Sequence, residues 1–221
     1  MKSTLEITDA QWRTAQKGEH HYWSGQGKDG DDWNKWWELH FDRYYFIPDT
    51  AKSLLEVGCG PYAQNARRIM ALHPQITELG LEDSLLLQYI AEERAVAKVK
   101  AEVRSSLPLE EMNMDRQFDV IVCINVLDHV RSVKKCFDVM YAHLRHGGML
   151  IVGNDLTSDK DLLNCPAMRD DPMHPIKMDF ESLTAFIFGD YRTIFLRVLE
   201  REQGRNPKAH YATLLWAGQK I

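Results

Sequence analysis

The segment SLLEVGCGP, residues 53–61, decides the fold class predicted for this chain. It begins as an apolar run, reaches Gly58 and Gly60, and leads into a helical pattern over 61–73 that Pro74 closes. A short apolar strand followed by a glycine turn and a helix is typical of a parallel sheet covered by helices. The glycines let a ligand approach the backbone without meeting a Cβ atom, and the helix start offers N–H groups. Taken alone, the segment also fits a glycine turn that binds nothing.

Apolar runs and helical patterns alternate along the rest of the chain, with a polar loop expected at 155–178. Strands are predicted at 76–82, 98–104, 118–125 and 149–154, and helices at 84–97, 131–145 and 180–188. Two final apolar runs are joined by the turn-rich segment QGRNPK, which predicts antiparallel pairing. We therefore expect a Rossmann-like α/β fold, in which an open parallel sheet ends in a C-terminal antiparallel hairpin. Such sheets bind ligands outside the carboxyl ends of their strands.

The front part of the chain differs in composition, because five of the six tryptophans precede residue 50. A glycine- and aspartate-rich loop is predicted at 18–32, and a helix at 32–46 with its aromatic side chains on one face. We expect residues 1–50 to form a helical cap or lid on a domain formed by 51–221. The aromatic side chains either pack this cap against the sheet or close over a ligand. The packing stripe is Trp33, Trp36, Trp37 and Tyr44. The candidates for closure are Tyr22, Trp23 and Trp37.

Charge and cysteine content narrow the classes of function. Lys+Arg 27 against Asp+Glu 32 gives a net charge of −5, so nucleic acid is not an expected partner. The 4 cysteines form no CxxC pair, which indicates neither a zinc site nor a disulfide framework and suits a reducing compartment. No apolar run approaches the ~18 residues of a membrane span, and the start MKSTLEITDA is too polar for a signal peptide. These features predict a cytoplasmic protein without a membrane span.

A pair of carboxylates, Glu82 and Asp83, directly follows the second predicted strand. A carboxylate at this point can accept hydrogen bonds from both hydroxyls of a ribose. The alternative is an acidic helix start, since carboxylates favour the first turn of a helix. A dinucleotide fingerprint fits poorly, because Ala63 stands at the third glycine position of GxGxxG.

Together these residues resemble the class I S-adenosylmethionine-dependent methyltransferases, over residues 52–221. The segments that carry the resemblance, in the order found in that superfamily, are LLEVGCGP (54–61), LGLEDS (79–84), SLPLEE (106–111), FDVIVCINVLDHV (118–130) and LRHGGMLIVG (144–153). The resemblance implies S-adenosyl-L-methionine as cofactor and identifies no subfamily.

The resemblance also implies which residues bind this cofactor. Glu82 would hold the ribose hydroxyls, with Asp83 beside the adenine. Ser105 lies in the stretch where many relatives carry an acidic residue that binds adenine, and Asn125 would lie near the sulfonium and amino group. Tyr62 stands where many relatives have a third glycine. The residues that would line the methionine part are Glu56, Gly58, Cys59 and Gly60.

Methyl transfer requires an acceptor atom held in line with the cofactor and, for a hydroxyl or protonated amine, a group that takes up a proton. The candidates are His129, after the fourth strand, and His174, in the loop after the fifth. For each, helix capping or packing in a turn is the alternative role. Asn154 and Asp155 are expected to shape the acceptor pocket rather than to bind magnesium, so no metal is predicted.

The predicted function is therefore methylation of a small molecule, on oxygen rather than nitrogen, with a natural product or a sugar-derived compound as acceptor. Methylation of a macromolecule (RNA or protein) and a non-catalytic, cofactor-binding role are the alternatives. The sequence leaves the oligomeric state open between monomer and homodimer.

Overall fold

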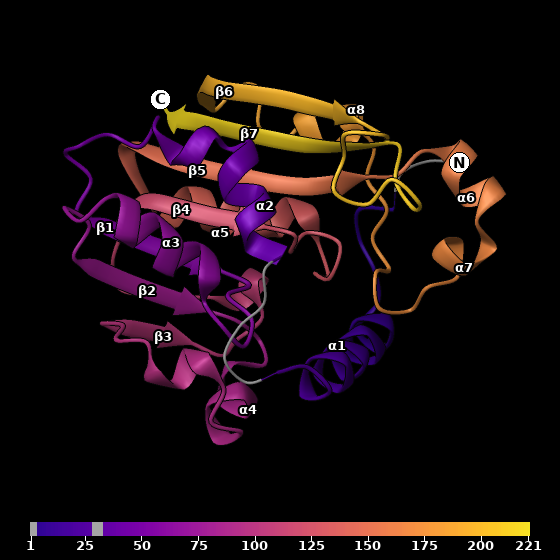
Figure 1. Cartoon of the computed structure of the whole chain (residues 1–221), viewed down its shortest axis with the longest axis horizontal. Coiled ribbons are helices and arrows are strands. Elements are labelled where there is room, and N and C mark those ends of the chain that lie inside the picture. The colour runs from indigo at the N-terminus through magenta and orange to yellow at the C-terminus, as the bar shows by residue number, and fades with distance from the viewer. Residues whose placement is uncertain (1–3, 28–32) are drawn as a thin grey trace.

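A 7-stranded sheet forms the centre of the molecule, with the strand order β3-β2-β1-β4-β5-β7-β6 (Figure 1). The computed structural model describes residues 4–27 and 33–221, apart from the side chains of 33 and 34. The strands are β1 (Ser53–Val57), β2 (Glu78–Glu82), β3 (Val103–Ser105), β4 (Phe118–Ile124), β5 (Leu144–Leu156), β6 (Tyr191–Glu200) and β7 (Ala212–Lys220).

The first five strands are parallel, and β7 pairs antiparallel with both β5 and β6. This arrangement confirms the predicted Rossmann-like sheet with a C-terminal hairpin. Two strands differ in length from their predictions. β5 is longer than 149–154, because its ladder with β7 continues to Leu156. β3 is three residues long and, among the described residues, pairs only with β2.

Helices cover both faces of the sheet and also lie beyond the carboxyl ends of its parallel strands. The α-helices are α1 (Asp9–Ser24), α2 (Trp33–His40), α3 (Gln64–Leu72), α4 (Leu86–Ala91), α5 (Val133–His143), α6 (Asp159–Asn164), α7 (Pro166–Arg169) and α8 (Phe180–Thr184). The short 3₁₀ helices are η1 (Asp42–Tyr44), η2 (Ala95–Lys98) and η3 (Leu109–Glu111). In Figure 1, α1, α6 and α7 lie beyond the carboxyl ends of the parallel strands. No helix of the described residues is both long and apolar enough to cross a membrane.

Each face of the sheet has its own hydrophobic core. Leu54 of β1 packs in the core that includes Trp37 and Ile69, from α2 and α3. Leu55, the next residue, packs in the opposite core with Phe137 of α5. Successive side chains of a strand point to opposite faces, so burial of both faces explains why the strands appear in the sequence as nearly continuous apolar runs.

The prediction of a loop at 18–32 is wrong for its first part, because α1 continues to Ser24. Thr8 begins this helix with a capping box that includes Gln11. Gly18 lies within the helix, and a Cβ there would come within 2.6 Å of the Met173 side chain. The glycine thus allows close packing of α1 against the segment before α8. The part of the predicted loop at 28–32 lies outside the described residues.

Two further predictions need correction. The helix predicted at 32–46 ends at His40, since residues 42–44 adopt positive φ angles of 46°, 55° and 58°. The polar loop predicted at 155–178 contains α6 and α7.

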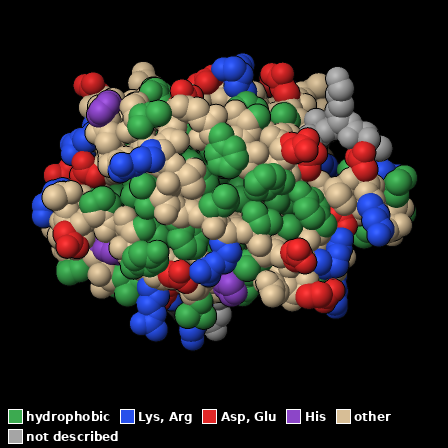
Figure 2. All heavy atoms as spheres, turned by 90° about the horizontal axis from the view of Figure 1, so that it is seen from above, with side chains coloured by type: hydrophobic (Ala, Val, Ile, Leu, Met, Phe, Trp, Pro, Cys, Tyr) green, Lys and Arg blue, Asp and Glu red, His purple; other side chains and the backbone are tan. Residues whose placement is uncertain are grey.

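The edge of the sheet formed by β6 carries exposed apolar side chains. Ile194, Leu196 and Val198 of β6 are 40%, 46% and 39% exposed, and Figure 2 shows hydrophobic side chains gathered on the face seen from above the sheet.

Candidate active site

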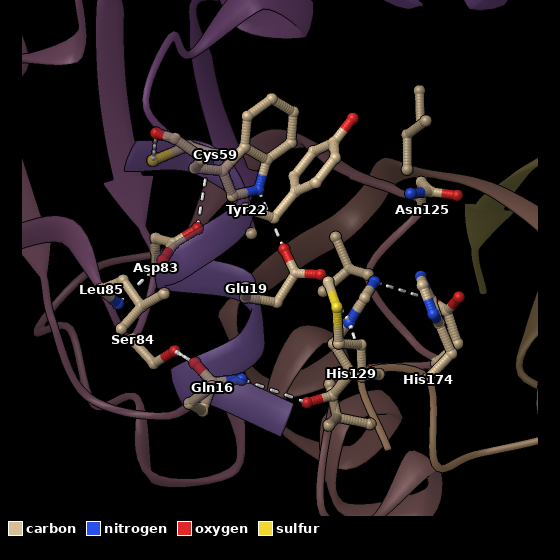
Figure 3. Close-up of a pocket in the computed structure, with 18 of the residues that line it drawn as sticks. Gln16, Glu19, Tyr22, Cys59, Asp83, Ser84, Leu85, Asn125, His129 and His174 are labelled. Atoms are coloured by element: carbon tan, nitrogen blue, oxygen red, sulfur yellow. Dashed lines mark hydrogen bonds and ion pairs between the residues drawn. The ribbon is translucent and has the colours of Figure 1, made fainter. Parts of the chain in front are cut away.

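A cavity of about 670 Å³ opens at the carboxyl ends of the parallel strands. Its walls come from α1, from the turn after β1, from the ends of β2, β4 and β5, and from the segments 167–177 and 205–210. Its volume lies within the range of about 300–1,000 Å³ that is usual for small-molecule sites. Figure 3 shows side chains from these separate segments converging on the same space.

The turn after β1 is fastened to the end of β2 by backbone donors. The Gly58 N–H donates to Glu82 Oε2 at 3.1 Å, and the Gly60 N–H donates to Asp83 Oδ2 at 2.9 Å. The Cys59 N–H donates to the backbone oxygen of Glu82 at 3.0 Å. All five residues line the cavity. The turn and the carboxylates predicted to bind one cofactor are therefore adjacent.

The two glycines of this turn serve different purposes. Both have positive φ, 60° at Gly58 and 58° at Gly60, which favours glycine. A Cβ at Gly58 would come within 2.3 Å of Val126, so this position is closed by packing. A Cβ at Gly60 would have no described neighbour within 4 Å. Gly60 is thus the position at which a ligand can approach the backbone.

Glu56 lines the cavity but also fixes the start of α3. Its carboxylate accepts hydrogen bonds from the Asn65 and Ala66 N–H groups, at 3.2 and 3.0 Å, and from Asn65 Nδ2 at 3.0 Å. A carboxylate at a helix N-terminus is favourable because unpaired N–H groups gather there. The resemblance assigned Glu56 to the methionine part of the cofactor, and the structure adds this second role.

Burial raises the pKa of each carboxyl group along this wall. The pKa of Glu56 rises to about 7 and that of Asp83 to about 6. The pKa of Glu82 is also raised, by burial and then by the nearby charge of Asp83. A cationic ligand, or hydroxyl donors, would offset the cost of ionising these groups.

Asn125 lies at the end of β4 with a positive φ of 58°. It lines the cavity together with Asp155, Arg205, His129 and His174, which form the second half of the cavity, away from the turn at 58–60. Its Oδ1 accepts a hydrogen bond from Arg205 Nη1 at 3.1 Å. The same nitrogen lies 3.2 Å from Asp155 Oδ2, and Thr213 donates to Asp155 Oδ1 at 2.6 Å. The Arg205 guanidinium also lies 5.7 Å from the ring centroid of the buried Trp37.

The two predicted catalytic histidines meet in this second half. Their ring centroids are 4.5 Å apart. His129 Nδ1 lies 2.9 Å from the Met173 carbonyl oxygen, and His174 Nδ1 lies 2.7 Å from Asp171 Oδ2. Sequence reasoning placed both at the carboxyl edge of the sheet, and the structure brings them together there.

His129 also stands between carboxylates. Glu19 Oε1 lies 3.3 Å from its Nδ1 (Figure 3). Asp128 Oδ1 lies 3.6 Å from its Nε2. Burial lowers the pKa of His129, but the charges of Asp128 and Glu19 outweigh this effect and the pKa is raised.

Helix α1 presents one face to the cavity. Trp12, Gln16, Glu19 and Trp23 follow helical spacing, and all four line it. Gln16 Nε2 donates to the His129 carbonyl oxygen at 3.4 Å. Trp23 Nε1 donates to Glu19 Oε2 at 2.9 Å. The helix is thereby held over the ends of the strands.

The chain after α1 is held by Tyr62, whose hydroxyl donates to the Gly27 carbonyl oxygen. Arg94 donates to the carbonyl oxygens of Gln26 and Gly27, at 3.2 and 2.9 Å. The Tyr62 ring lies edge-on to Trp23, with ring centroids 5.7 Å apart.

Most of the predicted site residues line the cavity, including the closure candidates Tyr22, Trp23 and Trp37. Two residues do not line it. The Ser105 hydroxyl accepts a hydrogen bond from the Leu107 N–H, and the Asn154 side chain donates to the Asp155 carbonyl oxygen.

Sequence reasoning missed Glu19 and Arg205, which are among the charged residues that line the cavity. Glu19 fell within the predicted loop, although its spacing from Trp12 and Trp23 could have revealed the helix face. Arg205 lies in the connection between the last two strands and carried no signal.

A glycine turn and paired carboxylates at the carboxyl edge of a Rossmann-like sheet are the arrangement implied by the resemblance to the class I S-adenosylmethionine-dependent methyltransferases. Residues 55–150 match the family model of a methyltransferase domain, which supports methyl transfer from S-adenosyl-L-methionine. The resemblance seen in the sequence is thereby confirmed.

Solved methyltransferases share the fold. The N-methyltransferase NodS from Bradyrhizobium japonicum WM9, in complex with S-adenosyl-L-homocysteine, has a TM-score of 0.67 at 14% identity, covering 96% of this chain and 99% of that chain. The 1,6-didemethyltoxoflavin-N1-methyltransferase from Burkholderia thailandensis has a TM-score of 0.66 at 14% identity, covering 100% of this chain and 93% of that chain. At such identities the similarity concerns the fold.

A curated relative is similar in sequence. The tRNA U34 carboxymethyltransferase of Syntrophotalea carbinolica is 34% identical over 131 residues, which are 57% of this chain and 39% of that protein. The chain thus matches about two fifths of the length of this relative.

The described residues fit the cofactor. Gly60 leaves open space for a ligand beside the backbone. Glu82 and Asp83 offer carboxylate oxygens along the same wall, suited to hydroxyl donors. The superfamily cofactor carries both a ribose and positive charge, so hydroxyl donors and a cation would meet these acidic groups.

Proposed function

We propose that this methyltransferase acts on a hydroxyl oxygen of a small molecule. The observation that supports the proposal is the continuity of the cavity, which runs from the turn at 58–60 to His129 and His174 beneath α1. A covered cavity of about 670 Å³ suits a compact acceptor beside the cofactor. A hydroxyl oxygen must lose a proton to become a good nucleophile, and a pair of imidazoles in the acceptor half suits that requirement.

The cofactor supplies an electrophilic methyl group on a positively charged sulfur. The chain then has to bind, orient and exclude water. The Gly60 backbone and the carboxylates of Glu82 and Asp83 bind the nucleoside, and α1 covers the reacting centre. Asp155 and Arg205 orient the acceptor. Such positioning supplies several kcal/mol of the barrier to reaction.

We also propose that residues 1–50 act as a cap on the methyltransferase domain formed by 51–221. The hydrogen bonds from Tyr62 and Arg94 to residues 26 and 27 support this role, since they tie the end of α1 to the domain. Trp37 belongs to the packed part of the cap, whereas Tyr22 is 41% exposed and suited to movement.

Cofactor affinity is expected to rise about tenfold between pH 5 and pH 7. The pKa of Asp83 is raised to about 6 by burial, so Asp83 is mostly protonated at the lower pH and ionised at the higher, and the ionised form binds the cofactor better. The charge of Glu19 also raises the pKa of Asp83, and the positive charge of His129 lowers it. The charge of Asp83 in turn raises the pKa of Glu82, on the same wall of the cavity. Isothermal titration with S-adenosyl-L-methionine across this range measures the effect. Asp83→Asn should flatten the slope, and Glu56, whose pKa is raised to about 7, accounts for what remains. An equally steep slope in that variant would contradict the role of Asp83.

His129→Ala is expected to lower turnover at least about tenfold. Loss of a proton-transfer group typically lowers the rate by about 10²–10⁴-fold, so tenfold is a minimum. Affinity for the cofactor should stay nearly unchanged, because the turn at 58–60 and Glu82 remain. Turnover is measured with the acceptor found by screening metabolite extracts with labelled methyl donor. His146→Ala, at an exposed position outside the cavity, is the control. Equal turnover in the two variants would remove His129 from the site.

A tRNA acceptor is the second candidate, favoured by the similarity to the tRNA U34 carboxymethyltransferase. The net charge of −5 opposes it, because binding to nucleic acid depends on neutralising phosphates. Incubation with labelled S-adenosyl-L-methionine and either total tRNA or a metabolite extract separates the two. Label in tRNA alone would overturn the small-molecule proposal.

A further inference from the structure

We propose that Glu19, His129 and His174 bind a divalent transition-metal ion in the acceptor half of the cavity. The three side chains come from α1, from the loop after β4 and from the loop before α8. Each offers one ligand atom, and these atoms all lie within 4.8 Å of one another. Figure 3 shows His129 between Glu19 and His174. Ligand atoms about 2.0–2.2 Å from a shared ion lie at most about 4.4 Å apart, so small side-chain movements would bring these three onto one ion.

The orientation of the imidazoles supports the site. Each ring has its Nδ1 beside an oxygen acceptor, which is Met173 O for His129 and Asp171 Oδ2 for His174. A metal-binding histidine typically donates one ring N–H to a carbonyl or carboxylate oxygen, which fixes the tautomer and leaves the other nitrogen for the ion. By this pattern Nε2 is the ligand atom of each ring, and Glu19 Oε1, which lies 3.3 Å from His129 Nδ1, would have to move toward the ion.

Asp128 provides a second, independent observation. It lines the cavity and is only 9% exposed. Its Oδ1 has no hydrogen-bond partner among the described residues and lies 3.6 Å from His129 Nε2. A buried carboxylate oxygen without a hydrogen bond is costly. A cation beside His129 would offset that cost and gain an additional oxygen ligand.

The donor set determines the class of ion. Two imidazole nitrogens with carboxylate oxygens suit Zn²⁺, Mn²⁺, Fe²⁺ or Co²⁺, whereas Mg²⁺ and Ca²⁺ prefer oxygen ligands alone. With three or four protein ligands, a coordination position stays available to a further oxygen.

The consequence for catalysis rests on the proposed function. An acceptor hydroxyl bound to the ion has a lowered pKa. With the ion bound, His129 and His174 would act as its ligands rather than as the groups that accept the proton. The O–H bond would break, the electron pair would stay on oxygen and the proton would pass to water, leaving an oxygen nucleophile next to the methyl donor. Because Glu19 belongs to α1, the same ion also fastens this helix over the cavity.

The test is metal binding by the full-length protein, without any acceptor. After removal of metals with a chelator, the protein is titrated calorimetrically with Zn²⁺ and, separately, with Mn²⁺. We expect one ion bound per chain. His129→Ala and His174→Ala should each weaken binding about 100-fold or more, because even the hydrogen-bond partners behind metal ligands are typically worth about 10–100-fold. Glu19→Gln keeps the size of the side chain and should also weaken binding.

His146→Ala serves as the matched control and should bind the ion as the unchanged protein does. Thermal unfolding of each variant shows that a loss of binding is not a loss of fold. The proposal is overturned if no ion binds stoichiometrically, or if the histidine variants bind it as tightly as the control does. The metal-free protein is also titrated with S-adenosyl-L-methionine. If the metal-free protein binds S-adenosyl-L-methionine but bound no metal ion in the first titration, the proposed metal site is refuted and the proposed function stays intact.

Discussion

Gly58→Ala is expected to destabilise the fold by about 2–5 kcal/mol. The added Cβ would lie 2.3 Å from Val126 in a packed region, and overpacking costs about 1–3 kcal/mol. The positive φ of 60° is also unfavourable for alanine, by about 1–2 kcal/mol. For a chain of this size the midpoint of thermal unfolding should fall by about 5–15 °C. Differential scanning calorimetry without ligand measures it.

Gly60→Ala is the matched control, since it has nearly the same φ but open space around its Cβ. Its free energy of unfolding should fall only by the cost of a positive φ at alanine, about 1–2 kcal/mol. Cofactor binding should weaken, because the alanine side chain enters the space of the ligand. An equal fall in the unfolding temperature of both variants would show that the two glycines do not differ as described.

Glu82→Ala is expected to weaken the binding of S-adenosyl-L-methionine by about 1.5–3 kcal/mol, as for the loss of a hydrogen bond to a charged group. Glu82 is 2% exposed, and its carboxylate also accepts from the Gly58 N–H. Because burial raises the pKa of this carboxyl group, its removal relieves a desolvation cost that partly offsets the lost hydrogen bond. Cofactor affinity should therefore fall more than stability does. Isothermal titration measures the affinity.

The control for this variant is Glu78→Ala, at the other end of β2, where the side chain pairs with Arg116 away from the cavity. Its affinity for the cofactor should stay within about twofold of the unchanged protein, since a surface ion pair is worth about 0–1 kcal/mol. A similar loss of affinity in both variants would show that β2 acts through stability alone.

The sheet and the cofactor half of the site were predictable because their signals are local. The apolar run at 53–57 ends at glycines required by positive φ, and a carboxylate pair ends the next strand. In a parallel sheet these strand ends meet at one edge. The residues assigned to that edge therefore came together as expected.

The acceptor half was predicted less completely because it depends on tertiary contacts. Gly18 indicated a loop, but it is helical because α1 packs closely against Met173. That error concealed Glu19, which faces His129 only when the helix is formed. Arg205 reaches Asp155 from a connection remote in the chain, and no spacing rule links the two.

A structure of the protein bound to S-adenosyl-L-homocysteine tests the central claim most directly. We expect the ribose hydroxyls within hydrogen-bond distance of Glu82 or Asp83 and the amino-acid portion against the backbone of residues 58–60. A ligand bound elsewhere, or one that touches neither carboxylate, would contradict the site described above.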